Sequence, residues 1–213
     1  MSNKKVIVAG ASGLVGYGAL KALAEAGCEV VAVSRRRPVE LHGATHVAAD
    51  LSDADQCRGI FGAMSDATHL VYAALYEKPG LVPGWLEAEQ IDTNDRMLRN
   101  LFEPLSAAAS NLQHVTLLQG TKAYGVHVQP IPVPARENRD EMHEQPNFYW
   151  NQENYLRDKQ KGRAWHWTVL RPQIIFGMSM GSAMNLIPAL GIYAALLREA
   201  GQPLIYPGGP GNI

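Results

Sequence analysis

Short apolar runs alternate with longer amphipathic stretches along most of the chain. The apolar runs predict buried strands at residues 5–9, 29–33, 45–48, 69–73, 114–118 and 166–170. The stretches between them predict helices near 17–26, 53–64, 86–109 and 148–162, and an apolar helix follows near 185–200. Strands and helices that alternate at this spacing are joined by right-handed crossovers and form a parallel sheet. The pattern therefore predicts an α/β fold with a doubly wound parallel sheet and helices on both faces.

Two segments depart from this rhythm. Residues 123–147 contain four prolines and show no clear period, and a long irregular segment of a compact domain is usually either functional or disordered. The last residues, 205–213, form a loop rich in glycine and proline with no element to close the fold. We therefore expect a fragment or a shortened form, in which any C-terminal subdomain is short or truncated.

A glycine turn stands between the first strand and the first helix. Its glycines, Gly10, Gly13 and Gly16, have the spacing typical of short-chain dehydrogenases rather than G-x-G-x-x-G. Such a turn lets the backbone approach a pyrophosphate, which the first-turn N–H groups and the helix dipole then hold. The alternative is a turn that collects glycine for steric reasons alone. The context favours a Rossmann-type nucleotide-binding domain, with contacts expected from Gly10, Ser12, Gly13, Leu14, Val15 and Gly16.

The residues after the second strand indicate which nucleotide binds. An acidic residue at this place accepts hydrogen bonds from the ribose 2′-hydroxyl of NAD, but this chain has Ser34, Arg35 and Arg36. Because a guanidinium can pair with a phosphate in bidentate fashion, this cluster favours NADP over the alternative of a solvated basic loop. Asp50 and Leu51, after the third strand, suit a contact to the adenine ring; an ordinary helix N-cap is the competing interpretation.

Composition narrows the function classes. The chain has 213 residues, of which 46% are hydrophobic, and a formal net charge of −1, which fits one soluble globular domain and gives no electrostatic reason to expect nucleic acid or a membrane surface. Its two cysteines lack metal-ligand spacing, its histidines form no H-x-x-x-H pair, and no apolar run reaches membrane-spanning length. We expect a cytoplasmic protein without a metal site, with a small-molecule substrate and with a homodimer left open.

Four segments together resemble one known family. They are residues 120–125 (GTKAYG), 147–154 (NFYWNQEN), 171–177 (RPQIIFG) and 182–185 (SAMN). In this order they are similar to the progesterone 5β-reductase/iridoid synthase-like reductases, an atypical branch of the extended short-chain dehydrogenases, and the resemblance covers essentially the whole chain. It implies an NADPH-dependent reductase of α,β-unsaturated carbonyl or plain carbonyl compounds. It also implies Lys122 and Tyr149 as catalytic residues and cofactor contacts at Pro172 and Ile174.

The chain departs from the family pattern at three places. Trp150 stands where a second tyrosine is common, Asn154 where aspartate is common, and Ala123 where a histidine usually follows the lysine. The tyrosine that would carry the chemistry is retained. A phenol near the substrate oxygen stabilises the developing negative charge, and a nearby ammonium is expected to lower the pKa of that phenol and to orient the nicotinamide ribose.

Two other functions compete with this one. Tyr155 and Lys159 have the Y-x-x-x-K spacing of ordinary short-chain dehydrogenases, which would fit a nucleotide-sugar epimerase or dehydratase. Tyr149 and Tyr155 project in directions roughly 120° apart on a helix, so both cannot face one nicotinamide. The third function is a non-catalytic NADP-binding sensor. For the leading function we expect a nucleotide-binding domain at 1–177 and the start of an incomplete substrate-binding subdomain at 178–213.

Overall fold

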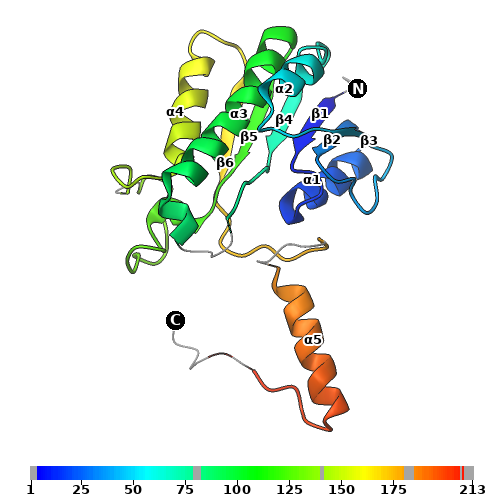
Figure 1. The fold of residues 1–213 in the computed structure, drawn as a ribbon, viewed down its shortest axis with the longest axis vertical. Helices are drawn as coiled ribbons and strands as arrows, with labels where there is room; N and C mark the ends of the chain where they lie inside the picture. Colours follow the sequence, from blue (N-terminus) through cyan, green and yellow to red (C-terminus); the bar gives the residue numbers. More distant parts are fainter. Residues whose placement is uncertain (1–3, 79–82, 140–141, 180–184, 207, 209–213) are drawn as a thin grey trace.

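The computed structural model describes residues 4–78, 83–139, 142–179, 185–206 and 208. Its centre is a six-stranded, fully parallel sheet with the order β3-β2-β1-β4-β5-β6 (Figure 1). The strands are β1 (Lys5–Ala9), β2 (Glu29–Ser34), β3 (Thr45–Ala48), β4 (His69–Tyr72), β5 (His114–Leu118) and β6 (His166–Leu170). The helices are α1 (Leu14–Glu25), α2 (Ala54–Phe61), α3 (Ala88–Ala108), α4 (Phe148–Gln160) and α5 (Leu186–Glu199), with short 3-10 helices η1 (Pro83–Leu86) and η2 (Thr121–Tyr124).

The predicted Rossmann-type fold is confirmed, and most element bounds agree within two or three residues. β1, β3, β5 and β6 have the predicted bounds. The clearest difference is α1, which begins at Leu14 rather than near Tyr17, because the end of the glycine turn is already helical. α3, predicted at 86–109, continues through Pro104 to Ala108.

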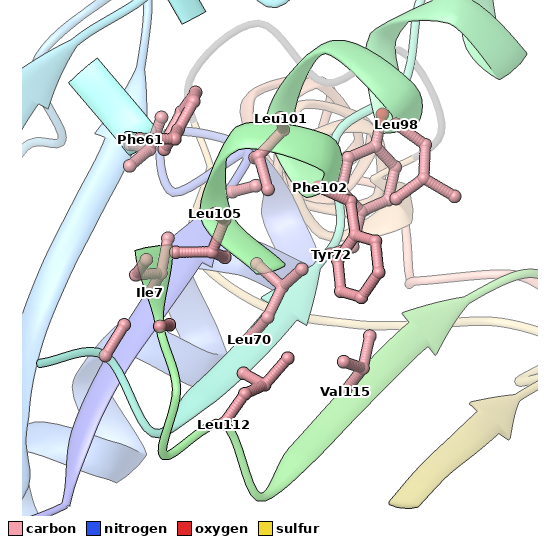
Figure 2. Packing of buried hydrophobic residues seen from close by; sticks show 14 of the residues in the cluster. Ile7, Phe61, Leu70, Tyr72, Leu98, Leu101, Phe102, Leu105, Leu112 and Val115 are labelled. Carbon is pink, nitrogen blue, oxygen red and sulfur yellow. The ribbon is translucent and has the colours of Figure 1, made fainter. Parts of the chain in front are cut away.

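Helices cover the two faces of the sheet unequally. On one face α2, α3 and α4 pack over the strands, and Figure 2 shows Phe102 of α3 lying beside Tyr72 of β4. On the other face α1 inserts the fully buried Leu20 among valines and alanines of β1 and β2. Burial of an apolar side chain of this size contributes about 2 kcal/mol relative to exposure, so these two clusters hold the helices on the sheet.

The C-terminal helix stands apart from this body. α5 begins at the Asn185 N-cap, whose side-chain oxygen accepts from the Ile187 amide at 3.3 Å, and none of its described residues is buried. In Figure 1 it projects away from the sheet. The division into residues 1–177 and 178–213 therefore stays a prediction, with α5 as the described helix of the second part.

The strand order places the site. From β1 the chain moves outward through β2 to β3, and it then returns to β4 beside β1 before moving outward in the opposite direction. In open α/β sheets a ligand binds outside the carboxyl ends of the strands at such a reversal of strand order. The fold therefore predicts a ligand site at the carboxyl ends of β1 and β4.

Candidate functional site

A groove of ≈ 1080 Å³ runs along the carboxyl edge of the sheet. Segments that follow β1, β2, β3, β4, β5 and β6, together with the start of α4, line it. The lining includes all but one of the residues predicted to bind a cofactor or to be catalytic: Gly10, Ser12, Gly13, Leu14, Val15, Ser34, Arg35, Arg36, Asp50, Leu51, Lys122, Tyr149, Pro172 and Ile174. The exception is Gly16, which is buried behind the turn. The structure thus brings together residues spread over most of the sequence.

The glycine turn is built so that its backbone faces the groove. Gly10 has φ +81, and a Cβ there would lie 2.6 Å from the Ala73 carbonyl oxygen, so only glycine lets the β1 and β4 ends approach this closely. A Cβ on Gly16 would collide with the Gly10 carbonyl oxygen. The first turn of α1 has no acidic residue and no side-chain cap, which leaves its N–H groups available to an anion.

The basic segment after β2 lies at the same end of the groove as Ser12. The Ser34 hydroxyl donates to the Arg36 carbonyl at 2.6 Å and shapes the turn that presents the exposed arginines. Ser12, Arg36 and Arg37 also line a small pocket of ≈ 210 Å³ beside the groove. Arg35 and Arg36 also line the groove itself, so guanidinium groups and the Ser12 hydroxyl are available to a phosphate at this end.

Asp50 is not the N-cap of α2, because Asp53 caps it by accepting hydrogen bonds from the amides of Asp55 and Gln56. Asp50 instead accepts from the Ser52 amide at 3.0 Å and the Ser52 hydroxyl at 2.8 Å. These hydrogen bonds lower the pKa of the Asp50 carboxyl, and Arg35 adds to the effect. The competing helix-cap interpretation of Asp50 is therefore wrong, and its carboxylate lies at the groove wall.

One side chain joins the two candidate catalytic residues. Lys122 belongs to η2, which follows β5, whereas Tyr149 belongs to the first turn of α4. Asn147 caps α4 by accepting from the Tyr149 amide at 3.0 Å, and its side-chain nitrogen donates to the Lys122 carbonyl at 3.5 Å. The two backbones are therefore tied together although they are far apart in sequence.

A buried polar network supports Tyr149 from behind. The Gln119 side-chain nitrogen donates to the Tyr149 carbonyl at 3.2 Å, and its oxygen accepts from Arg171 at 3.0 Å. Arg171 also donates to Glu153 of α4 at 2.6 Å. Gln119 was not predicted from the sequence; its place directly after β5, at the carboxyl edge of the sheet, is the one signal that marks it.

Burial controls the charges of the candidate pair. Desolvation lowers the pKa of the half-buried Lys122 ammonium, and the nearby Glu77 opposes this effect. Burial raises the pKa of the Tyr149 phenol, Glu77 raises it further, and Arg171 lowers it. The expectation that Lys122 would lower the pKa of this phenol is thus wrong, because desolvation prevails and the opposing cation is Arg171. Tyr149 is consequently a protonated donor across the neutral range.

Apolar residues form the wall beside the pair. Leu75, Trp85 and Phe148 line this part of the groove, and Trp85 lies with its face over the Lys122 ammonium. Trp85 and Glu77 were not predicted from the sequence. They lie in a loop and a 3-10 helix with no periodic pattern, so no signal in the sequence marks them.

The competing Tyr155–Lys159 pair lies elsewhere. Tyr155 is 5% exposed and packs edge-on against Phe102 in the core between α3, α4 and the sheet. Lys159 forms an ion pair with Glu103 of α3 at 3.1 Å. Neither residue is among those that line the groove.

Of the four segments that resemble the reductase family, residues 182–184 lie outside the described residues.

The described residues hold neither a metal-binding cluster nor a helix that could cross a membrane. In residues 4–78, 83–139, 142–179 and 185–206, no three His, Cys, Asp or Glu side chains are grouped so that they could hold a metal ion. Within the part of the chain that the structure describes, no helix combines the length and the apolar character needed to cross a membrane.

Comparison with known proteins identifies the family. Residues 84–209, more than half of the chain, match the PRISE-like Rossmann-fold domain. The chain belongs to this family. The resemblance expected from the four sequence segments is thereby confirmed.

Two relatives of the PRISE-like chain illustrate the match. The 3-oxo-Delta(4,5)-steroid 5-beta-reductase of Arabidopsis thaliana is 33% identical over 183 residues, which cover 81% of this chain and 45% of the relative. The (S)-8-oxocitronellyl enol synthase of Nepeta racemosa is 31% identical over 216 residues, which cover 95% of this chain and 54% of the relative. The chain spans about half the length of these curated relatives.

Solved structures show the same fold. A UDP-glucose 4-epimerase from Bifidobacterium longum in complex with NAD+ and UDP has a TM-score of 0.71 at 19% identity, covering 90% of this chain and 62% of its own. The Bordetella bronchiseptica enzyme WbmH in complex with NAD+ has a TM-score of 0.64 at 21% identity, covering 93% of this chain and 63% of its own. At these identities the likeness concerns the fold.

Proposed function

We propose that the chain is an NADPH-dependent oxidoreductase that reduces α,β-unsaturated carbonyl or carbonyl compounds, in which Tyr149 stabilises the negative charge on the substrate oxygen and Lys122 assists. The observation that carries the proposal is the placement of Lys122 and Tyr149 on the wall of the groove that begins at the glycine turn. The named relatives, a steroid 5-beta-reductase and an enol synthase, support a reductase of this kind.

The residues that line the groove fit a dinucleotide that carries a 2′-phosphate. The close contact of Gly16 with Gly10 keeps the α1 N-terminus against the strand end, where backbone N–H groups can hold a pyrophosphate. Arg35 and Arg36 would hold a 2′-phosphate, with Ser12 adding a hydroxyl, and these residues support NADP rather than NAD. Asp50 and Leu51 would contact the adenine ring, and Pro172 and Ile174 the nicotinamide half.

The chain's own residues would act on the substrate oxygen. When bound, NADPH supplies a hydride. The Tyr149 phenol, protonated near neutral pH, donates a hydrogen bond to the carbonyl oxygen, where negative charge develops, and so stabilises an enolate. If the carbonyl carbon itself accepts the hydride, the same phenol donates its proton to the alkoxide. Leu75, Trp85 and Phe148 exclude water from this end and favour an apolar substrate.

The epimerase or dehydratase alternative loses support from the position of Tyr155, whose ring is buried against Phe102. The sensor alternative differs from the proposed function in one measurable outcome, NADPH binding without turnover. The cytoplasmic location is likewise a proposal, which rests on the low cysteine content of the sequence.

The test is a kinetic comparison of two tyrosines on one helix. The purified protein is incubated with NADPH and 2-cyclohexen-1-one, and loss of the reduced nicotinamide absorbance is followed. The saturated ketone and the allylic alcohol have the same mass, so ¹H NMR of the product, or its gas-chromatographic retention against both standards, distinguishes them and assigns the reaction. Tyr149→Phe should lower kcat/KM by about a hundredfold or more, whereas the control Tyr155→Phe should retain activity. Loss of activity in Tyr155→Phe alone would overturn the proposal, and tight NADPH binding without turnover on any enone would favour the sensor.

A further inference from the structure

Trp85 makes contacts to both candidate catalytic residues. Its indole is 3% exposed, and the Lys122 ammonium lies 3.6 Å from the centroid of the ring. The ring of Tyr149 meets it edge-on, with centroids 5.3 Å apart, and Phe148 lies 4.9 Å away. One indole therefore adjoins the ammonium and the phenol ring at the same time.

The orientation of this indole is set from its polar edge. The Trp85 ring N–H donates to a Glu77 carboxylate oxygen at 3.0 Å. Glu77 lies between two residues whose backbones are held by α3. The Tyr76 amide and carbonyl both bond the Asn94 side chain at 2.8 Å, and the Lys78 amide donates to Gln90 at 2.9 Å. The buried side chains of α3 thus hold the loop, the loop holds Glu77, and Glu77 holds the ring.

A lysine side chain needs such a support. Its four-carbon stem carries about 2 kcal/mol of rotamer entropy, so an unsupported ammonium samples many positions. A desolvated ammonium over an indole face is attracted by the ring quadrupole, and tryptophan is the strongest of the aromatic partners. Lys122 is half-buried and its backbone is fixed through Asn147, which leaves the stem as the part still to be positioned.

We propose that Trp85, oriented by Glu77, is a positioning residue that holds the Lys122 ammonium beside Tyr149 for the reaction. Its effect on catalysis rests on the proposed function, in which Lys122 assists the Tyr149 phenol. The position of the Lys122 ammonium does not depend on the proposed function, because it can be observed without turnover.

The first experiment observes the ammonium directly. Lysines of the full chain are reductively methylated with ¹³C-formaldehyde, which keeps their charge, and the Lys122 signal is assigned by its loss in Lys122→Arg. The ring current of Trp85 should move this signal upfield of the other lysine signals. The shift should disappear in Trp85→Leu and in Glu77→Leu. The shift should persist in Glu77→Gln, whose amide oxygen can still accept from the indole. It should also persist in the control Trp167→Leu, because Trp167 packs against the core cluster that contains Phe102 and Tyr155. A Lys122 signal without an upfield shift, or one unchanged by Trp85→Leu, would overturn the proposal.

The second experiment separates positioning from packing. Trp85→Leu should lower kcat for the enone about tenfold and change its KM by less than about twofold, and Trp85→Phe, which keeps a ring face, should recover part of the loss. In a Lys122→Met background the same Trp85→Leu change should alter kcat by less than about twofold, because its effect passes through the ammonium. An equal loss in both backgrounds would show that Trp85 only packs against Tyr149 and would overturn the proposal.

The two experiments also distinguish this inference from the proposed function. Full activity of Lys122→Met would overturn the role of Lys122 in the reaction, and with it any catalytic effect of Trp85, even where the upfield shift is present. An active wild-type enzyme whose Lys122 signal shows no upfield shift would leave the proposed function standing and overturn the inference about Trp85.

Discussion

Tyr149 and Tyr155 belong to the same helix, α4, yet they contact different parts of the molecule. Tyr149 lines the groove and rests its edge on Trp85, whereas Tyr155 packs against Phe102 of α3 with ring centroids 6.1 Å apart. The helical repeat separates the two side chains by roughly 120°, so the face that packs on α3 cannot also present a phenol to the groove. The choice between the two predicted tyrosines therefore depends on which face of α4 is buried.

Gly16→Ala should abolish NADPH binding and lower the free energy of unfolding by more than about 2 kcal/mol. The added methyl group would collide with the Gly10 carbonyl and push α1 away from the strand end. Gly18→Ala on the same helix is the matched control, because nothing lies within 4 Å of the added atom and the position is exposed. It should raise the free energy of unfolding by about 0.5–1 kcal/mol. Urea unfolding and NADPH titration measure both effects, and equal behaviour of the two variants would contradict this account.

The glycine turn and its surroundings show which features could be predicted from the sequence. The strands were predictable because each is a short apolar run, and the cofactor-facing residues because they follow those strands at the edge where the carboxyl ends meet. The start of α1 at Leu14 was not predictable, because the glycine spacing predicts a turn up to Gly16. Glu77 and Trp85 could not be predicted, because their contacts to Lys122 and Tyr149 depend on a nonperiodic loop held by buried amides of α3.

Arg35→Ser should raise the Kd for NADPH about tenfold or more and leave the Kd for NADH nearly unchanged. Only NADPH carries the 2′-phosphate that a guanidinium at the end of β2 would bind, and a hydrogen bond to a charged group contributes about 1.5–3 kcal/mol. Arg163→Ser removes another exposed arginine, from the turn after α4, and should change neither Kd. Fluorescence titration with both nucleotides gives the ratio, and a parallel weakening of NADH would contradict a 2′-phosphate contact.

Cys57 should resist alkylation near pH 8 while Cys28 reacts. Cys57 is fully buried, and burial together with Asp53 and Asp50 raises the pKa of its thiol to about 11. A raised pKa means less thiolate near neutral pH, and the thiolate is the reactive form, so reactivity should increase only as the pH approaches that value. This matters for the proposed substrates, since enones also react with thiolates. Mass spectrometry after iodoacetamide treatment, with Cys28→Ser as a single-thiol reference, measures the difference. Equal labelling of both cysteines in the folded chain would contradict it.

Glu153→Leu should lower the free energy of unfolding by about 3–5 kcal/mol and also lower kcat. Arg171 and Glu153 form a buried ion pair, with side chains 14% and 6% exposed, and removing the carboxylate leaves a buried guanidinium without its charge partner. Arg171 also donates to Gln119, which in turn donates to the Tyr149 carbonyl, so loss of the ion pair should displace Tyr149 in the groove and lower kcat. Glu153→Gln keeps an acceptor and should cost less. Asp158→Asn, in an exposed pair with Lys161 at the end of α4, should stay within about 0.5 kcal/mol of the wild type. Urea unfolding gives the stabilities, and a Glu153→Leu variant as stable as Asp158→Asn would show that the pair does not support Tyr149.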